Sequence, residues 1–551
     1  MASMERTLLE WMREPAEDRG LHFAGENDAW EFCSYRELAL QSLTAANALR
    51  ARGLKGGSVV AIVQRTGPAF WATLFGALTA GVTACSVAPP FGMQRADAYQ
   101  QWAGHLLATA RPDLVIADHE VQDSVRQAAE AASIKPPVSF TDLISHAEPG
   151  TGAWPRPKTA LLQFTSGSTG RPRCVRIPPA ALQANVTAMR AWLDWTSDSA
   201  GASWLPAFHD MGLIGTVTSI AAGSDTWLMQ PADFIRKPLR YLACLSDHRV
   251  SITPMPNFGL AYMLRRVKPA DLEGMRFDSL RAVVLGAERI DPRVLEATEK
   301  LLGPFGLDRR ALLPAYGGAE ATLAVTGVPP GEGWTTARLA QSGAADSPGA
   351  RIVGCGRPLS GVDVSIEDDD GEPVTDGVVG EIVVKSPSLA TGYHGDTGAS
   401  SAASFRDDVL HSGDAGFMID GQLFVLGRLG DGIKVRGRMI FAESIETFLA
   451  ERGIPERRAA ILLGVRDGVT TAAAAFEVMR PDWPAITAAV LREWIDDADM
   501  VLINLPRGGL AVTSSGKVRR RVMWKALCDG TLGGERVPLP AAPFPGMAGT
   551  R

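Results

Sequence analysis

The feature that most constrains the fold is a repeated alternation of short uncharged strands with helices through the first half of the chain. Residues 35–52 carry apolar side chains at helical spacing and stop at Gly53, and residues 59–63 follow as an uncharged strand. Further strand-like runs follow at residues 160–164, 203–205, 250–253 and 281–285. Strands buried on both faces read as continuous apolar runs, so the pattern predicts an α/β fold with largely parallel sheets.

One segment of this region is long and apolar enough to suggest a membrane span. Residues 68–92 contain no charged side chain, and a stretch of that length can cross a bilayer. Gly76 and Gly81 interrupt it, however, and Pro89 with Pro90 closes it. We therefore interpret the segment as a buried helix, a turn and a buried strand, and we expect no membrane span.

The second half of the chain has a different pattern of expected secondary structure. Short strands separated by glycine and aspartate turns are expected at residues 362–367, 381–385 and 422–426. They predict a β-rich subdomain at about residues 350–427, which completes a large domain of residues 1–427.

A smaller unit is expected after a hinge. Residues 427–437 are rich in glycine and charge, and the strands and helix beyond them predict a small, mobile α+β domain at 428–529. Its expected elements are the strands 459–465 and 472–478 and the helix 486–496. The proline- and glycine-rich residues 530–551 are expected to form a disordered tail.

Bulk composition narrows the class of protein. A chain of 551 residues exceeds a single core, so two to four folding units are expected. Its net charge of −6 gives no reason to expect a nucleic-acid partner. The six cysteines form no C-x-x-C pair, and the charged N-terminus does not resemble a signal peptide. A cytoplasmic location and a small-molecule or protein partner are therefore expected.

The most informative local pattern is the segment LQFTSGSTGRPRCVRI, residues 162–177. An apolar strand leads into a loop whose N–H groups and hydroxyls are suited to wrap phosphate oxygens. The alternative is a polar surface turn, which is uncommon for six such residues directly after a buried strand. The spacing of residues within 162–177 does not match G-x-x-x-x-G-K-[ST], so the segment is not the phosphate loop of P-loop kinases and GTPases. The expected phosphate contacts are Thr165, Ser166, Gly167, Ser168, Thr169, Gly170 and Arg173.

T-S-G-S-T-G-x-P resembles the signature of the adenylate-forming (acyl-activating) enzymes, and the resemblance extends over about residues 30–525. Other motifs of that family follow in the expected order. The resemblance implies that Tyr316 stacks on adenine beside a nucleotide contact at Gly317, that Glu320 holds Mg²⁺ together with Thr165, and that Lys517 is the catalytic lysine of the mobile domain. It also implies nucleotide contacts at Gly286, Ala287, Glu288, Asp414 and Arg428.

Residues 203–215, SWLPAFHDMGLIG, are similar to the form found in fatty acyl-AMP ligases. Amino-acid-activating domains carry F-D-x-S there, so its absence favours an acid without an α-amino group. The resemblance gives His209 a catalytic and pocket-lining role, although a lone histidine is more often packed in a core. The acyl pocket is then expected at His209, Met255, Asn257 and Gly318, with Met255 shortening it.

Several residues depart from the family pattern. Arg173 stands where lysine is usual in the phosphate loop, which keeps the charge but changes the geometry. Gly430 stands at the hinge, where aspartate or lysine is usual. Met439 and Ala442 replace an asparagine and a proline in the loop that serves thioester formation. These departures make the use of coenzyme A less expected.

The resemblance implies a two-step reaction that uses ATP and Mg²⁺. A carboxylic acid, expected to be a fatty acid, becomes acyl-AMP with release of pyrophosphate, and the acyl group then passes to the phosphopantetheine thiol of a separate acyl carrier protein. The separate carrier is expected because no D-S-L-like serine site follows Lys517. The alternatives are an acyl-CoA synthetase, which CoA product analysis would reveal, and an adenylate-binding pseudoenzyme, which would release no pyrophosphate.

Overall fold

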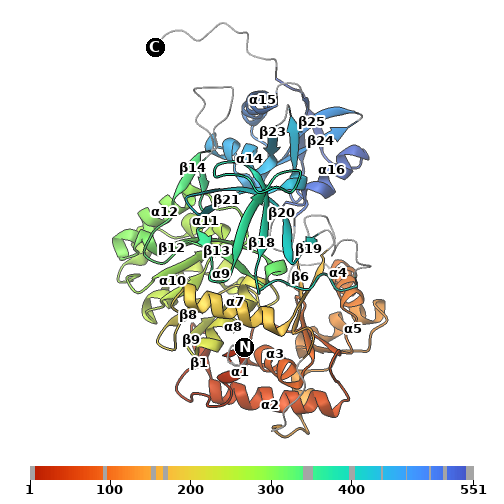
Figure 1. Cartoon of the computed structure of the whole chain (residues 1–551), viewed down its shortest axis with the longest axis vertical. Coiled ribbons are helices and arrows are strands. Elements are labelled where there is room, and N and C mark those ends of the chain that lie inside the picture. Colours follow the sequence, from red (N-terminus) through yellow and green to blue (C-terminus); the bar gives the residue numbers. More distant parts are fainter. Residues whose placement is uncertain are drawn as a thin grey trace.

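The architecture comes from a computed structural model. It describes residues 7–90, 96–150, 157–165, 172–338, 351–395, 404–435, 438–466, 468–495, 498–512 and 518–540. Within these residues the chain forms two sheets flanked by helices, a β-rich sheet beside them, and a C-terminal α+β unit that lies at the opposite end from the N-terminal helices (Figure 1). The α/β fold class is confirmed.

The first sheet has the strand order β5-β3-β4-β6-β7, with β7 antiparallel to β6 and the other pairs parallel. Its strands are β3 (Val59–Val63), β4 (Thr83–Ser86), β5 (Leu114–Ala117), β6 (Leu161–Phe164) and β7 (Cys174–Ile177). Alternate residues of β3 point to opposite faces. Val60 and Ile62 pack with α2 (Tyr35–Ala51) and α3 (Pro68–Ala80), and the others face α4 (Ala96–Ala110) and α5 (Gln122–Ala131).

The interpretation of the uncharged segment as a helix, a turn and a strand is confirmed. In α3, Phe70, Trp71 and Phe75 are at most 1% exposed, because this helix lies between the sheet and α2. The helix ends at Gly81, whose positive φ of 72° turns the chain into β4. Among the described helices, none combines the length and the apolar character needed to cross a membrane.

The second sheet has nine strands in the order β16-β13-β12-β11-β10-β8-β9-β1-β2. They are β1 (Gly20–Ala24), β2 (Trp30–Ser34), β8 (Ala200–Ser203), β9 (Asp225–Leu228), β10 (Ile252–Pro254), β11 (Ala282–Leu285), β12 (Leu312–Gly317), β13 (Ala324–Gly327) and β16 (Arg357–Pro358). The helices that accompany this sheet are α7 (Pro179–Trp192), α8 (Asp210–Ala222), α10 (Pro238–Asp247), α11 (Asn257–Arg266) and α12 (Pro292–Leu302).

The expected strand at residues 203–205 is displaced, because β8 spans Ala200–Ser203 instead. Small residues are needed there, since a Cβ on Gly201 would lie 3.2 Å from the Trp195 ring. Trp204 and Leu205 follow the strand, in a turn where Leu205 donates its N–H to the Ser203 hydroxyl. The apolar pair that suggested the strand therefore belongs to the segment that leads into α8.

The β-rich sheet contains β17 (Asp363–Glu367), β18 (Gly380–Lys385), β19 (Phe405–Arg406), β20 (Val409–Ile419) and β21 (Gln422–Arg428), all paired antiparallel. Strands expected from the sequence are present at β17, β18 and β21. The long strand β20 was not predicted. Glycine and aspartate at residues 413–414 interrupt its apolar pattern, and these two residues belong to the candidate site.

Beyond β21 the chain enters the C-terminal elements β22 (Gly432–Val435), β23 (Arg438–Phe441), α14 (Ala442–Glu451), β24 (Ala459–Arg466), β25 (Val469–Glu477), α15 (Trp483–Trp494), β26 (Asp499–Leu505), α16 (Arg520–Cys528) and β27 (Glu535–Val537). The expected disordered tail from residue 530 is wrong for Glu535–Val537. These residues pair antiparallel with β26, because the edge of that strand offers free backbone groups. Residues 541–551 lie outside the described residues.

Candidate active site

The expected phosphate loop begins directly after a buried strand. Thr165 follows β6, donates its N–H to the Arg173 carbonyl at 2.9 Å and accepts the Arg173 N–H at its hydroxyl. These bonds hold the two ends of the loop together as an extension of the β6–β7 hairpin. Ser166, Gly167, Ser168, Thr169 and Gly170 lie outside the described residues, so their phosphate contacts stay a prediction.

Arg173 and Glu320 are brought together by a residue that the sequence analysis missed. The Arg173 guanidinium lies 4.4 Å from the centre of the Tyr393 ring, and Tyr393 Oη donates to Glu320 Oε1 at 3.1 Å. Burial, with the Glu320 carboxylate adding to it, raises the pKa of Tyr393 to about 12. The hydroxyl therefore keeps its proton at neutral pH. Arg173 Nε is buried without a hydrogen bond in the described part of the chain, so it can donate to an anion.

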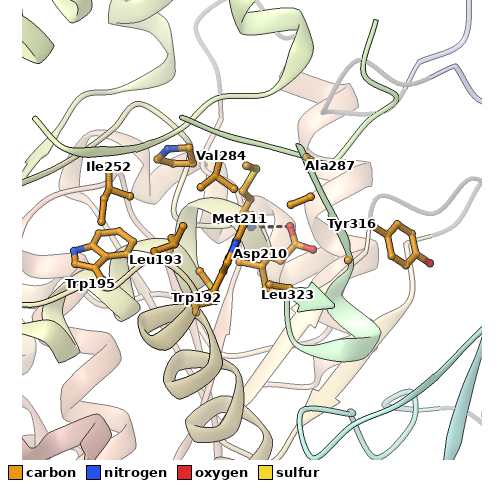
Figure 2. Close-up of a pocket in the computed structure, with 17 residues that line it drawn as sticks. Trp192, Leu193, Trp195, Asp210, Met211, Ile252, Val284, Ala287, Tyr316 and Leu323 are labelled. Atoms are coloured by element: carbon orange, nitrogen blue, oxygen red, sulfur yellow. Dashed lines mark hydrogen bonds between the residues drawn. The ribbon is translucent and has the colours of Figure 1, made fainter. Parts of the chain in front are cut away.

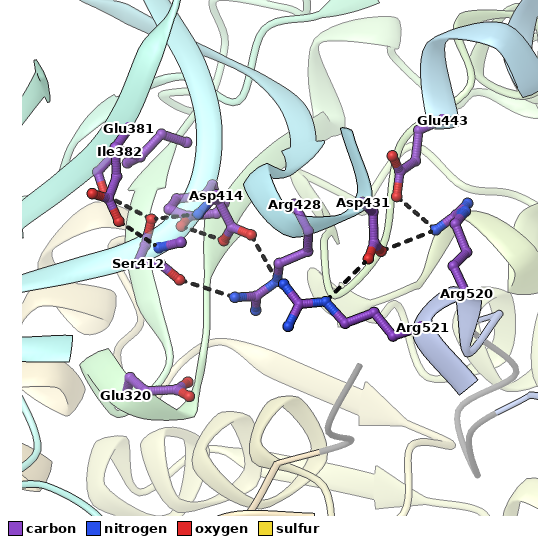
Figure 3. A network of polar contacts seen from close by, with 12 residues as sticks. Glu320, Glu381, Ile382, Ser412, Asp414, Arg428, Asp431, Glu443, Arg520 and Arg521 are labelled. Carbon is purple, nitrogen blue, oxygen red and sulfur yellow. Dashed lines mark hydrogen bonds and ion pairs between the residues drawn. The ribbon is translucent and has the colours of Figure 1, made fainter. Parts of the chain in front are cut away.

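Tyr316, Asp414 and Arg428 form a second polar group. Tyr316, near the end of β12, donates its hydroxyl to Asp414 Oδ2 at 2.7 Å. Arg428 Nε lies 2.8 Å from Asp414 Oδ1, and Figure 3 shows these two side chains facing each other. Burial, followed by the charge of Asp414, raises the pKa of Tyr316, and Asp414 raises that of Arg428. The register of β20 against β21 makes Asp414 and Arg428 direct neighbours.

The turn that carries Asp414 is stabilised by hydrogen bonds to neighbouring residues. Ser412 Oγ accepts the Asp414 N–H and donates to the Ile382 carbonyl at 2.6 Å, and Glu381 accepts the Gly413 N–H. Gly413 has a φ of 70°, a conformation that favours glycine. These contacts explain the Ser-Gly-Asp sequence: the serine and glycine shape the backbone that presents the aspartate.

An apolar cavity extends from this polar region into the large domain. Figure 2 shows it between Tyr316 and Ala287 at one end and Ile252 and Trp195 at the other. Asp210 is its only charged lining residue, and its Oδ1 accepts the Met211 N–H at 2.7 Å. The complete lining is Met189, Trp192, Leu193, Trp195, Asp210, Met211, Gly215, Ile252, Pro254, Val284, Gly286, Ala287, Ala315, Tyr316, Gly317, Leu323 and Ala324.

The four residues expected to form the acyl pocket do not line this cavity. His209 precedes α8 with its ring 5.0 Å from that of Phe208, and Gly318 donates its N–H to Leu323. Met255 is 2% exposed, and its sulfur accepts a hydrogen bond from Trp204 Nε1 at 3.3 Å. Asn257 accepts the N–H of Asp291. Met211 and Gly215 do line the cavity, and they lie four residues apart on one side of α8. This helical spacing was the signal in the sequence from which a cavity wall on α8 could have been predicted.

Gly286 and Ala287 line the cavity as expected for residues beside a nucleotide, but Glu288 is directed elsewhere. Its Oε1 accepts the Phe258 N–H at 2.6 Å at the start of α11, and its Oε2 lies 3.9 Å from Arg457 Nη2. Arg457 follows the hinge in the sequence, so Glu288 joins the large domain to the C-terminal unit.

The expected hinge contains a group of buried charges. A Cβ built on Gly430 would overlap the guanidinium of Arg521, so a larger residue there would require this half-exposed side chain to move. The neighbouring Asp431 lies 3.6 Å from Arg520 Nη1, and Arg520 also binds Glu443 and Glu446 at 2.6 and 2.5 Å (Figure 3).

The expected catalytic lysine lies outside the described residues, as do its neighbours from 513 onward. The described residues on either side, Val512 and Val518, form an isolated antiparallel bridge. Ala442 is fully buried as the first residue of α14, and Met439 belongs to β23.

Comparison with known proteins identifies the family. The model of the family described as AMP-binding enzyme matches residues 9–394, more than half of the chain, and the protein belongs to this family. It is 29% identical over 546 residues to medium-chain-fatty-acid–[acyl-carrier-protein] ligase JamA of Moorena producens, covering 91% of this chain and 90% of that one. It is 28% identical over 515 residues to 4-hydroxyphenylalkanoate adenylyltransferase of Mycobacterium tuberculosis, with 84% and 81% covered.

Solved structures agree with this assignment. One chain from structural and functional studies of fatty acyl-adenylate ligases from E. coli and L. pneumophila superposes with a TM-score of 0.86 at 27% identity. The match covers 96% of this chain and 98% of that one. The expected resemblance to adenylate-forming enzymes is therefore confirmed.

The residues present are suited to Mg²⁺ bound together with a nucleotide. Glu320 offers a carboxylate and Thr165 a hydroxyl, and Mg²⁺ prefers oxygen ligands, often one or two from protein with the rest from phosphates and water. Among the described residues no group of three or more His, Cys, Asp or Glu side chains is arranged to hold a metal. Glu320 and Thr165 are therefore the described residues that would hold Mg²⁺ together with a nucleotide.

Proposed function

We propose that this protein joins a fatty acid to AMP, with release of pyrophosphate, and then transfers the acyl group to the phosphopantetheine thiol of a separate acyl carrier protein. One observation carries the proposal. Tyr316 belongs both to the polar group with Asp414 and Arg428 and to the wall of the apolar cavity. An acid whose chain occupies the cavity would therefore present its carboxylate beside the nucleotide site.

This chain offers groups that can carry out each step. A carboxylate oxygen attacks the α-phosphorus of ATP, the bond to the leaving pyrophosphate breaks, and acyl-AMP forms. Arg173 and Lys517 offset the repulsion between the two anions, and bound Mg²⁺ supplies further positive charge. Asp414, fixed by Arg428, accepts hydrogen bonds from the ribose hydroxyls. In the second step a thiolate attacks the acyl carbonyl and AMP leaves.

The test is release of pyrophosphate across a panel of aliphatic and aryl-alkanoic acids, each assayed with CoA, with a phosphopantetheinylated carrier protein, and with neither. We expect release that requires a fatty acid, acyl-AMP that persists in CoA, and an acylated carrier detected by mass. Accumulation of acyl-CoA would instead identify an acyl-CoA synthetase. Absence of release with every acid would favour a protein that only binds adenylates.

Replacement of Tyr393 by phenylalanine tests the link between Arg173 and Glu320. The ring beneath the guanidinium remains, but the hydrogen bond to the carboxylate is lost, and such bonds to charged groups contribute roughly 1.5–3 kcal/mol. We expect kcat/KM for pyrophosphate release to fall about ten-fold, with more Mg²⁺ needed for half-maximal rate. Tyr262→Phe, which removes a hydroxyl that donates to the Ile235 carbonyl and lies outside both the polar group and the cavity lining, is the control. Equal Mg²⁺ dependence in both variants would contradict the assignment.

A further inference from the structure

We propose that Trp195 closes the far end of the apolar cavity and sets the longest acyl chain that the protein accepts. The inference rests on the proposed function and names what limits the substrate. It concerns the end of the cavity opposite Tyr316, where Leu193 and Trp195 lie with Ile252, whereas a second tryptophan, Trp192, lines the cavity beside Asp210 and Leu323 (Figure 2).

Both indole rings are fixed in position by a hydrogen bond. Trp192 Nε1 donates to the Val328 carbonyl at 2.9 Å, and Trp195 Nε1 donates to Ser224 Oγ at 3.0 Å. A buried indole N–H loses considerable free energy if it leaves its partner, so neither ring is free to swing aside for a longer chain. The closed end is therefore a rigid wall rather than a gate.

Each indole also lies against a glycine of the neighbouring sheet. A Cβ built on Gly327 of β13 would overlap the Trp192 ring, and one built on Gly201 of β8 would lie 3.2 Å from Trp195 Cζ2. The two glycines allow the rings to pack directly on strand backbones. The position of the wall is thus determined by residues far from it in the sequence.

The width of the cavity depends on a third glycine. Gly215 lines the cavity from α8, and a Cβ built on it would meet no atom within 4 Å. By contrast, a Cβ on Gly212, one turn earlier, would overlap the Pro206 carbonyl. A side chain at residue 215 therefore enters the cavity without displacing the protein, and its helical backbone tolerates the change.

These features predict a defined dependence on chain length. Each methylene that the cavity buries should raise kcat/KM about four-fold, and the increase should stop when the terminal methyl group reaches the Trp195 indole. A longer chain must leave methylenes outside or displace a hydrogen-bonded ring, so its kcat/KM should fall.

The test measures kcat/KM for pyrophosphate release with saturated acids from butanoic to octadecanoic, in the full-length protein and three variants. Trp195→Leu removes the ring at the closed end and should move the optimum to longer acids. Gly215→Leu should move it to shorter ones, with at least a ten-fold loss for the acid that is best in the wild type. Trp334→Leu removes a buried tryptophan that does not line the cavity and should leave the optimum unchanged.

Opposite shifts in two variants cannot result from general destabilisation, which would lower all rates together. Unchanged length profiles in Trp195→Leu and Gly215→Leu would overturn the inference. If no acid supports pyrophosphate release, the proposed function fails. Calorimetric titration of the same acids into the four proteins then tests the inference independently of activity. The same opposite shifts in affinity would support it, and identical profiles or no binding would overturn it.

Discussion

Lys517→Ala is expected to lower fatty-acid-dependent pyrophosphate release by roughly 10²–10³-fold, the usual effect of removing one group that stabilises transition-state charge. The reason is electrostatic. The attacking carboxylate and the α-phosphate are both anions, and Lys517 is the mobile cation expected to offset their repulsion. The measurement is the steady-state rate of pyrophosphate release at saturating ATP.

The matched control for this variant is Lys525→Ala. Lys525 lies on α16, eight residues further along, and its ion pair with Asp529 is exposed, so its loss should change the rate little. Binding of the fatty acid should be unaffected in both variants, since neither lysine lines the cavity within the described residues. A Lys517→Ala rate within a few-fold of the wild type would contradict a catalytic role for this lysine.

Arg520→Met is expected to lower the free energy of unfolding of the C-terminal unit by about 3–5 kcal/mol, because it leaves buried carboxylates without their partner. Arg520 is nearly enclosed and bridges Glu443, Glu446 and Asp431. Methionine fills most of the space but carries no charge, so the loss reports the electrostatic interaction rather than a large cavity. Urea unfolding monitored by far-UV circular dichroism measures it.

The same carboxylates make the effect depend on pH. Burial raises the pKa of Glu446 to about 7, despite the nearby Arg520. A folded-state pKa above the unfolded value means that Glu446 contributes stability below its unfolded pKa of about 4.5, and that this stability is lost as the pH rises through about 7. Without Arg520 the pKa should rise further, so the deficit of the variant should be greater at pH 8 than at pH 6.

The control for Arg520→Met is Arg466→Met. Arg466 pairs with the half-exposed Asp499 on the same sheet, and removal of such a pair should change the unfolding free energy by about 1 kcal/mol or less at both pH values. A deficit for Arg520→Met that is equal at pH 6 and pH 8 would show that the buried carboxylates are not what the arginine stabilises.

Much of the fold was accessible from the sequence, because its signals are local. Strands such as β3 and β11 are uncharged runs between helices of clear periodicity, and their predicted positions agree with the structure to within one residue. Predictions from local sequence were wrong where a residue distant in the sequence determines the bounds of a strand. β8 lies three residues earlier than predicted because Gly201 must accept Trp195, and β27 is ordered because β26 offers it an edge.

In the candidate site, too, the residues within short motifs were predicted, and those positioned by distant contacts were not. Tyr316, Asp414 and Arg428 were identified within short contiguous motifs, and the structure brings all three into contact. Tyr393 was missed, since a single tyrosine beyond any motif gives no signal until folding places it between Arg173 and Glu320. The expected pocket residues Met255 and Asn257 have other partners in the structure.

The sequence by itself identified the family, most of the order of the elements, and the residues Tyr316, Asp414 and Arg428 that the structure brings together, because each of these is encoded in a short run of neighbouring residues. Only the tertiary structure decided the course of the apolar cavity and the residues that end it. Most of the lining residues, such as Met189, Leu193 and Val284, read as ordinary core in the sequence. Whether such residues fill a space or enclose one depends on contacts such as that of Trp192 with Gly327, which lie more than a hundred residues apart and follow only from packing.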